Sequence, residues 1–186
     1  MVRTRRALAI SNFLRQHDLV QVQWVTLSSG QVRNTPARQL TLRARQSAVQ
    51  ERTVQTSVDI LRFDGFLVIV GGGAVDYELL RELYVAGGHL VGADGGADHI
   101  VAAGLVPEAI IGDLDSLSAP DAWLGRTYLV RLPEQETTDF EKALYSTEAP
   151  LTIAMGMTGG RFDHTLAALD AVSKHAIDRT IILVDA

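Results

Sequence analysis

From Phe63 onward the sequence alternates short apolar segments with segments of helical periodicity, and this alternation constrains the fold most strongly. Continuous apolar strands that alternate with helices are typical of a parallel sheet covered on both faces. We therefore expect an α/β fold, a parallel-sheet three-layer sandwich of about six strands with helices on both faces. The expected strands are residues 66–70, 89–92, 109–111, 128–132, 151–155 and 180–184, and the expected helices are residues 76–86, 97–103, 138–146 and 163–175.

Glycine and aspartate gather where these expected strands end. The clusters are residues 71–73, 94–96, 113–115 and 159–163. The carboxyl ends of parallel strands lie at one edge of a sheet, and ligands of such proteins bind beyond that edge. The sequence therefore predicts one ligand site, lined by glycine backbone and carboxylates.

Composition and missing motifs narrow the chemistry of that site. The 186 residues are 47% hydrophobic, enough for a packed core, and they include no cysteine, which excludes disulfide scaffolds, iron–sulfur clusters and thiol catalysis. No apolar run approaches the roughly 18 residues of a membrane span. The patterns of P-loop kinases, dinucleotide dehydrogenases and α/β-hydrolases are also missing. An acidic, glycine-lined edge with one Lys and one Arg suits Mg²⁺–nucleotide chemistry.

Charge divides the chain near residue 62. Residues 1–62 carry ten Arg, no Lys and three acids, a net charge of +7, whereas residues 63–186 have a net charge of −12. We expect a basic N-terminal extension over 1–62 and an α/β domain over 63–186. In the extension, residues 20–24 alternate like a strand and residues 39–50 are compatible with a short helix. A disordered segment, a small β-rich appendage and a targeting segment all stay open, and we expect no nucleic-acid or membrane partner.

Asp113 and Asp115 are the sharpest candidates for chemistry. In extended backbone, residues two apart point to the same side, where two carboxylates repel each other unless a cation lies between them. Mg²⁺, which prefers oxygen ligands, meets that need. A local turn stabilised by Asp side chains explains the same residues equally well. Asp94, after the second expected strand, would bring a third carboxylate to the same edge and favours the metal.

The helix expected from residue 138 adds further charged candidates. Thr138 and Glu141 form a capping-box pattern, which places Asp139 in the first helical turn. The helix dipole favours a carboxylate there, so Asp139 is explained either as a site residue or as a helix-stabilising residue. Lys142 lies on the same face and either reaches a phosphate or pairs with Asp139 and stays solvated. Gln135, just upstream, is either a ligand-binding or an ordinary loop residue.

Two glycine-rich loops complete the candidates. Residues 71–73 offer backbone N–H groups to a phosphate or form a glycine turn without a ligand. After the glycines at 159–160, Arg161 supplies a planar donor fork suited to phosphate. Asp163 either caps the next helix, accepts from a substrate, or does both. His164 either orients a neighbour or, as we favour, packs against the sheet.

Four motifs, taken in order, resemble thiamine pyrophosphokinase (thiamine diphosphokinase). They are Ala93-Asp94-Gly95-Gly96-Ala97, Ile111-Gly112-Asp113-Leu114-Asp115-Ser116, Thr138-Asp139-Phe140-Glu141-Lys142-Ala143-Leu144 and Gly159-Gly160-Arg161-Phe162-Asp163-His164-Thr165-Leu166. The resemblance covers about residues 66–186 and says nothing of residues 1–62. It implies transfer of the β,γ-pyrophosphoryl unit of ATP to thiamine, giving thiamine diphosphate and AMP. It also implies Mg²⁺ as the cofactor, ATP and thiamine as partners, a cytoplasmic location and, for the full-length family, a homodimer.

The resemblance further implies roles for single residues. The expected metal ligands are Asp94, Asp113, Asp115 and Asp139. These four form the expected catalytic set together with Lys142 and Asp163. The residues expected to bind nucleotide and substrate are Gly72, Gly73, Gly95, Gln135, Arg161 and His164.

Two departures from the family pattern accompany the resemblance. The family continues into a C-terminal β-sandwich domain that contacts thiamine, whereas this chain stops at Asp185-Ala186, so we expect that domain to be absent from a truncated chain. Ala168 stands where the family often has Asn. The alternatives are a related pyrophosphokinase that acts on a pterin-like alcohol and a noncatalytic remnant that binds a nucleotide.

Overall fold

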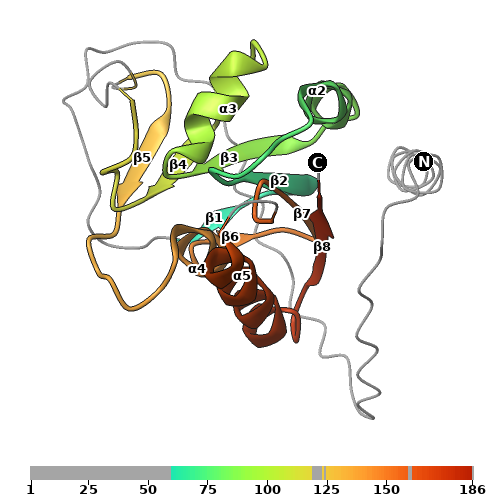
Figure 1. Ribbon diagram of the computed structural model, residues 1–186. Coiled ribbons are helices and arrows are strands. Elements are labelled where there is room, and N and C mark those ends of the chain that lie inside the picture. Colours follow the sequence, from blue (N-terminus) through green and yellow to red (C-terminus); the bar gives the residue numbers. More distant parts are fainter. Residues whose placement is uncertain (1–59, 119–122, 124, 159–160, 186) are drawn as a thin grey trace.

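The computed structural model describes residues 60–118, 123, 125–158 and 161–185 (Figure 1). The strand expected over residues 20–24, the helix expected over residues 39–50, and Gly159 and Gly160 lie outside these ranges. Every strand and helix expected from Phe63 onward lies inside them.

Within the described residues, six parallel strands form one sheet in the order β5-β4-β3-β2-β7-β8. Each lies within one residue of its expected position, so the predicted α/β sheet is confirmed. The bounds are β2 (Phe66–Val70), β3 (His89–Ala93), β4 (Ala109–Gly112), β5 (Tyr128–Arg131), β7 (Leu151–Met155) and β8 (Thr180–Val184).

A second, two-stranded pair is not visible in the sequence pattern. The strands β1 (Leu61–Arg62) and β6 (Thr147–Glu148) run parallel to each other, and Arg62 Nε also donates to Glu148 Oε2 at 2.8 Å. Two residues are too few to show a period, which is why the pattern misses them. Strand β1 lies directly before the expected domain boundary at residue 63, and that boundary stays a prediction.

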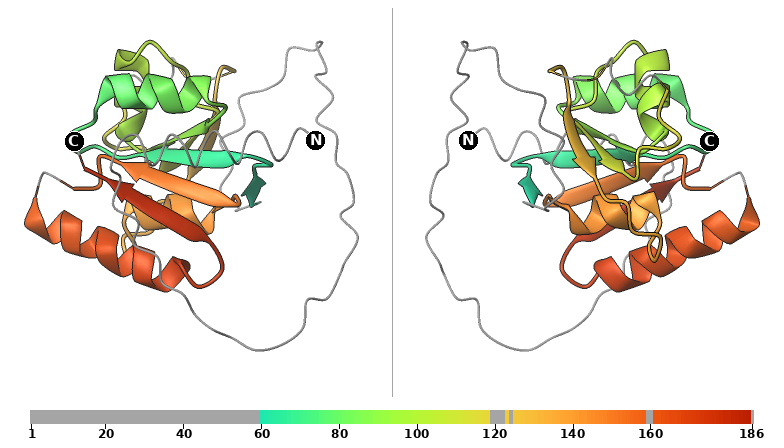
Figure 2. Two further views of the ribbon diagram at one scale, coloured as in Figure 1. Left: turned by 90° about the vertical axis from the view of Figure 1, so that its right-hand side faces the viewer. Right: turned by 90° about the vertical axis from the view of Figure 1, so that its left-hand side faces the viewer.

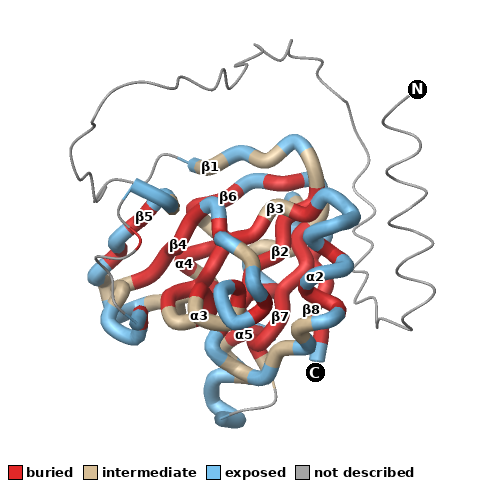
Figure 3. Tube along the Cα trace, turned by 90° about the horizontal axis from the view of Figure 1, so that it is seen from above, coloured by how far each residue is buried: buried red, intermediate tan, exposed pale blue. Residues whose placement is uncertain are grey.

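The described helices cover both faces of the sheet (Figures 1 and 2). Alternate residues of β2 explain the two packing layers, since Val68 packs with the residues of α2 and α3 while Leu67 and Ile69 pack with those of α4 and α5. All of β2 is buried (Figure 3), which accounts for its unbroken apolar sequence. The bounds are α2 (Tyr77–Val85), α3 (Gly96–Ala102), α4 (Asp139–Tyr145) and α5 (Phe162–His175).

The strand order reverses direction between β2 and β7, and this reversal positions the site. The chain starts at β2 in the middle of the sheet, moves outward through β3, β4 and β5, and then crosses to β7 on the other side of β2. In doubly wound folds, a ligand crevice forms at the carboxyl edge where the order reverses. Here the loops after β2 and β7 are in close contact. A Cβ added to Gly71 would lie only 2.8 Å from the carbonyl oxygen of Gly156.

The described helices and strands form this one layered unit. Among the described residues no β-sandwich is present, and α5, at 14 residues, is the longest helix. No helix in this part of the chain has both the length and the apolar character needed to cross a bilayer.

Candidate active site

A cleft of about 510 Å³ opens at the carboxyl edge of the sheet, over the reversal point between β2 and β7. Ten of the twelve predicted site residues line it, and the other two, Asp115 and Asp163, hydrogen-bond to its lining residues Ser116 and Arg161. The cleft thus brings together side chains that are far apart in the sequence. The ten are Gly72, Gly73, Asp94, Gly95, Asp113, Gln135, Asp139, Lys142, Arg161 and His164.

Asp94 lies at the base of the acidic part of this cleft, directly after β3. Its φ angle is +45°, a conformation that Asp tolerates better than most residues, and only 3% of it is exposed. Its Oδ2 accepts from the Ser116 backbone N–H at 3.1 Å, whereas its buried Oδ1 has no partner among the described residues. Burial raises the pKa of Asp94, and the nearby carboxylates of Asp139 and Asp113 raise it further.

Asp113 and Asp115 meet through a turn and not through extended backbone. Leu114 between them has a φ of +65°, and the Asp115 N–H donates to Asp113 Oδ1 at 3.2 Å. The left-handed conformation costs energy for a leucine, and its side chain packs against a buried cluster that includes Trp123. The expectation of an extended segment is therefore wrong, but the carboxylates still lie together. The turn and the metal explanations of this motif are compatible.

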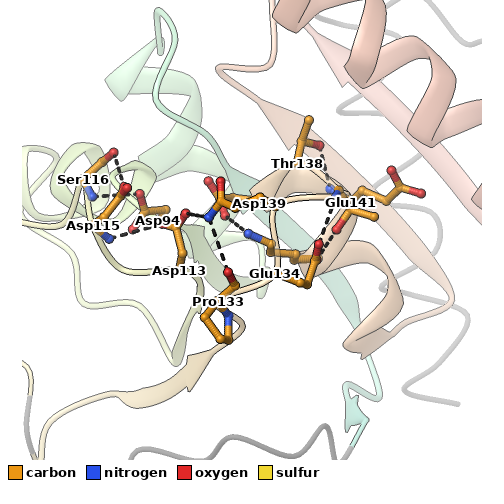
Figure 4. Close-up of polar contacts among 12 residues, drawn as sticks. Asp94, Asp113, Asp115, Ser116, Pro133, Glu134, Thr138, Asp139 and Glu141 are labelled. Atoms are coloured by element: carbon orange, nitrogen blue, oxygen red, sulfur yellow. Dashed lines mark hydrogen bonds and ion pairs between the residues drawn. The ribbon is translucent and has the colours of Figure 1, made fainter.

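The carboxylates of Asp94, Asp113 and Asp115 form a compact acidic cluster (Figure 4). One oxygen from each lies within 4.8 Å of the others. Gln135 Nε2 donates to Asp113 Oδ2 at 2.9 Å, and this hydrogen bond lowers the pKa of Asp113. The cluster suits a hard divalent cation, because carboxylate oxygens are its preferred ligands and none of the described residues donates to the buried Asp94 Oδ1.

Asp139 is held by Lys142 and is not part of that compact group. Thr138 caps α4 by accepting from the Glu141 N–H at 3.2 Å, as predicted, and Asp139 is the first helical residue. Lys142 Nζ lies 3.0 Å from Asp139 Oδ1, and the Lys142 side chain is only 1% exposed. The expectation that a paired Lys142 stays solvated is wrong, because it lies on the face of α4 that packs inward with Phe140 and Ala143. A role for Asp139 as fourth metal ligand stays a prediction.

The glycine loops make close backbone contacts. The N–H groups of Gly71 and Gly73 donate to the carbonyls of Met155 and Gly156, each at 2.8 Å, and Gly72 lies exposed in the cleft. Helix α2 begins later, after Asp76, whose side chain accepts from two N–H groups of the first turn. Gly72 and Gly73 therefore line the cleft as loop residues and are not the start of a helix.

Gly95 and Gly96 explain how α3 approaches the sheet so closely. A Cβ on Gly96 would lie 1.9 Å from the Val70 carbonyl oxygen, which only glycine can avoid. Gly95 precedes α3 as its N-cap and faces the Ser116 backbone. Binding of a ligand by Gly72, Gly73 and Gly95 stays a prediction.

Arg161, Asp163 and His164 lie at the mouth of the cleft. Arg161 donates to Asp163 twice, from Nε at 3.1 Å and from Nη2 at 2.5 Å, and both side chains are exposed. This hydrogen-bonded pair lowers the pKa of Asp163. Arg161, and not Asp163, is the N-cap position of α5. His164 is exposed and lines the cleft, so the interpretation that it packs against the sheet is wrong.

Sequence reasoning misses several residues that shape the cleft. Ser116 binds Asp94 through its backbone, Thr158 lines the cleft and donates to Asp185 Oδ1 at 2.6 Å, and Glu134 organises the loop before α4. For Ser116, the adjacent Asp113-Leu114-Asp115 motif was an available signal. For Glu134, the only signal was a run of polar residues, which is typical of any loop.

A parallel α/β sheet with clustered carboxylates, glycine loops and a buried lysine at its reversal point is typical of proteins that bind phosphorylated ligands with a divalent cation. The family model described as the catalytic domain of thiamin pyrophosphokinase matches residues 81–183. The chain belongs to the thiamin pyrophosphokinase family. None of the curated proteins matches the chain.

Solved structures agree with this assignment. The thiamin pyrophosphokinase of Geobacillus thermodenitrificans is 32% identical with a TM-score of 0.54, and the match covers 64% of this chain and 59% of that one. The Bacillus subtilis thiamine pyrophosphokinase is 25% identical with a TM-score of 0.53, over 64% of this chain and 60% of that one. The Candida albicans enzyme, at 14% identity and a TM-score of 0.54, covers 72% of this chain and 64% of its own and shows the fold alone. The chain spans about three-fifths of the length of the bacterial relatives.

Proposed function

We propose that this protein transfers the β,γ-pyrophosphoryl unit of ATP to thiamine, giving thiamine diphosphate and AMP. The hydroxyl oxygen of thiamine forms a bond to the β-phosphorus, the bond from that phosphorus to the α,β-bridging oxygen breaks, and the hydroxyl proton is released. The proposal is carried by one observation: one carboxylate oxygen each of Asp94, Asp113 and Asp115 lies within 4.8 Å of the others, beside the cleft of a chain that belongs to the thiamin pyrophosphokinase family.

The residues of the acidic cluster fit Mg²⁺. Asp94, Asp113 and Asp115 supply oxygen ligands, and the buried Asp94 Oδ1 has no donor among the described residues. Asp139 is a candidate fourth ligand from the start of α4. When bound, the cation neutralises phosphate charge and orients the triphosphate for in-line displacement.

The other cleft residues position the substrates. Lys142 provides a buried positive charge next to the acidic cluster, where burial strengthens its attraction for phosphate. Arg161 offers a planar donor fork at the mouth, and binding a phosphate there would require it to leave Asp163. Gly72, where an added Cβ would meet no heavy atom within 4 Å, leaves room for a ligand to approach the backbone. Gly73 and Gly95 line the cleft beside it, and Gln135 and His164 complete the polar lining.

Calorimetry with ATP, in the presence and absence of Mg²⁺, tests the metal and nucleotide part of the proposal. We expect Mg²⁺ to strengthen ATP binding to the wild type and Asp113→Ala to remove that gain. Asp170→Ala, which changes an exposed carboxylate of α5, is the matched control and should behave like the wild type. Equal affinity of the wild type and Asp113→Ala for Mg-ATP would overturn the metal site.

Product analysis tests the acceptor. Incubation with ATP and either thiamine or a pterin alcohol should release AMP with thiamine alone. AMP with the pterin alcohol would instead identify a related pyrophosphokinase, and binding of Mg-ATP without AMP from either acceptor would identify a noncatalytic nucleotide-binding domain. Because the chain covers about three-fifths of its bacterial relatives, binding and turnover are measured separately.

Family membership also supports two further proposals, that the protein works in the cytoplasm and that the full-length members of the family are homodimers. Light scattering coupled to gel filtration of a full-length member measures its mass in solution, and a monomer at micromolar concentration would contradict the homodimer. Microscopy of a tagged chain reports the location.

A further inference from the structure

Glu134 makes four hydrogen bonds although it does not line the cleft. Its Oε2 accepts from the backbone N–H groups of Glu136 at 2.8 Å and of Thr137 at 3.0 Å. Its Oε1 accepts from the Thr137 hydroxyl and from Tyr145 Oη at 3.1 Å. A carboxylate has about four acceptor positions, so these four donors saturate it.

These hydrogen bonds join the loop before α4 to the body of the protein. Tyr145 is the last residue of α4, and its ring packs against the core on the α4–α5 face of the sheet. Glu134 therefore closes the loop upon itself through Thr137 and anchors it to α4 through Tyr145. Such a loop has few remaining conformations, because three side chains and two backbone groups must move together to open it.

The residues beside Glu134 face the cleft. Gln135, Thr137 and Thr138 all line it, and the Gln135 amide donates to Asp113 in the acidic cluster. The direction of the Gln135 side chain depends on the backbone between Glu134 and Thr137, which Glu134 holds. Without that carboxylate, the bond from Gln135 to Asp113 would have to be maintained by a loose loop.

We propose that Glu134 is a positioning residue, which holds Gln135 against Asp113 and thereby sets the affinity of the cleft for a nucleotide–cation complex. The effect on nucleotide–cation affinity rests on the proposed function, whereas the positioning of Gln135 by Glu134 does not. Glu134 is not itself a ligand or a base, because each of its oxygens already accepts two hydrogen bonds and it lies outside the cleft lining.

Two substitutions of Glu134 separate its geometry from its charge. Glu134→Ala removes all four acceptor positions. In Glu134→Gln, the amide oxygen can keep both backbone N–H bonds while the amide nitrogen donates to the hydroxyls of Thr137 and Tyr145, which can rotate to accept. We therefore expect Glu134→Gln to rescue most of what Glu134→Ala loses. Glu136→Ala, a neighbouring acid whose exposed side chain is outside this network, is the matched control.

The first measurement needs no nucleotide. Amide hydrogen exchange at Glu136 and Thr137 should become about tenfold faster or more in Glu134→Ala, the effect of losing one good hydrogen bond. The Gln135 side-chain amide resonances should move toward those of a free glutamine. Both should stay close to wild type in Glu134→Gln. Unchanged amide exchange, or unchanged Gln135 resonances, in Glu134→Ala would overturn the positioning role.

The second measurement tests whether Glu134 acts through Gln135. Mg-ATP affinity should fall about tenfold in Glu134→Ala and in Gln135→Ala, and the double variant should bind within about twofold of Gln135→Ala. Multiplied effects in the double variant would show that Glu134 acts by another route and would overturn the inference. If the wild type binds no Mg-ATP, the proposed function fails, and the exchange and resonance data still decide whether Glu134 positions Gln135.

Discussion

Replacing Asp94 with Asn should stabilise the cation-free protein while removing its response to Mg²⁺. Asp94 is buried, and its Oδ1 has no partner in the part of the chain that the structure describes. One of its oxygens lies within 4.8 Å of one oxygen each of Asp113 and Asp115. In Asp94→Asn, the amide oxygen can still accept from the Ser116 N–H, and the amide nitrogen can donate to a neighbouring carboxylate. The substitution thus replaces the repulsion between neighbouring carboxylates by a hydrogen bond from an amide to a carboxylate.

The magnitude follows from the spacing of the charges. Two unit charges 4.8 Å apart repel by about 3.5 kcal/mol at an effective dielectric constant of 20 and by about 0.9 kcal/mol in water. Asp113 is partly exposed and Asp115 exposed, and Asn loses a charge-assisted hydrogen bond from Ser116, so the net gain should be about 1 kcal/mol. For a domain of this size, that raises the melting temperature by about 4 °C.

Thermal unfolding in EDTA and at increasing Mg²⁺ concentrations measures both effects. At a Mg²⁺ concentration ten times the dissociation constant, the wild type should gain about 1.4 kcal/mol and the variant almost nothing, so the advantage of the variant disappears. Asp170→Asn, an exposed carboxylate paired with Lys174, should change stability by less than about 0.5 kcal/mol and respond to Mg²⁺ normally. An Asp94→Asn protein that is less stable than wild type in EDTA, or equally stabilised by Mg²⁺, would refute this reasoning.

Three further predictions concern burial, packing and pH. Lys142→Met should lower the free energy of unfolding by about 2 kcal/mol, measured in urea, and should weaken Mg-ATP binding, measured by calorimetry. Lys174→Met, which breaks a half-exposed ion pair, should change neither quantity. Gly96→Ala should cost more than about 3 kcal/mol in urea unfolding because its Cβ would meet a β2 carbonyl oxygen, whereas Gly72→Ala, with no heavy atom within 4 Å, should be nearly neutral. Hydrogen bonds from Thr137 lower the pKa of Glu134 from 4.5 to about 2. The stabilisation that the ionised Glu134 carboxylate gives the folded state is therefore complete above pH 4.5 and is lost as the pH falls toward 2. The stability difference between wild type and Glu134→Gln should shrink by about 1 kcal/mol across that window, and a constant difference would contradict the assignment.

Most of the site could be predicted because residues that follow the strands of a parallel sheet lie close together in space. Parallel strands end at one edge, so Asp94 after β3 and Asp113 after β4 had to lie near each other once the alternation of strands and helices was recognised. The capping role of Thr138 was predictable for a similar reason, since it depends on residues only three positions apart. These features are local in sequence or follow from topology alone.

The remaining features depend on contacts between distant segments. The burial of Lys142 depends on which side of α4 packs inward, and a seven-residue helix is too short for its periodicity to show this. The anchor of Glu134 is Tyr145, eleven positions later, and the partner of Asp94 is Ser116, 22 positions later. No local pattern marks these pairs.

The sequence by itself determined the α/β class, the six main strands and the edge of the sheet where the polar residues gather. These features could be predicted because hydrophobic periodicity and glycine positions are patterns among residues that are close together in the sequence. The tertiary structure alone decided that Asp94 Oδ1 is buried with no donor among the described residues, that Lys142 is shielded from solvent and that Glu134 organises a loop. Those properties are set by the desolvation and hydrogen bonding that arise only when the strands and helices pack together.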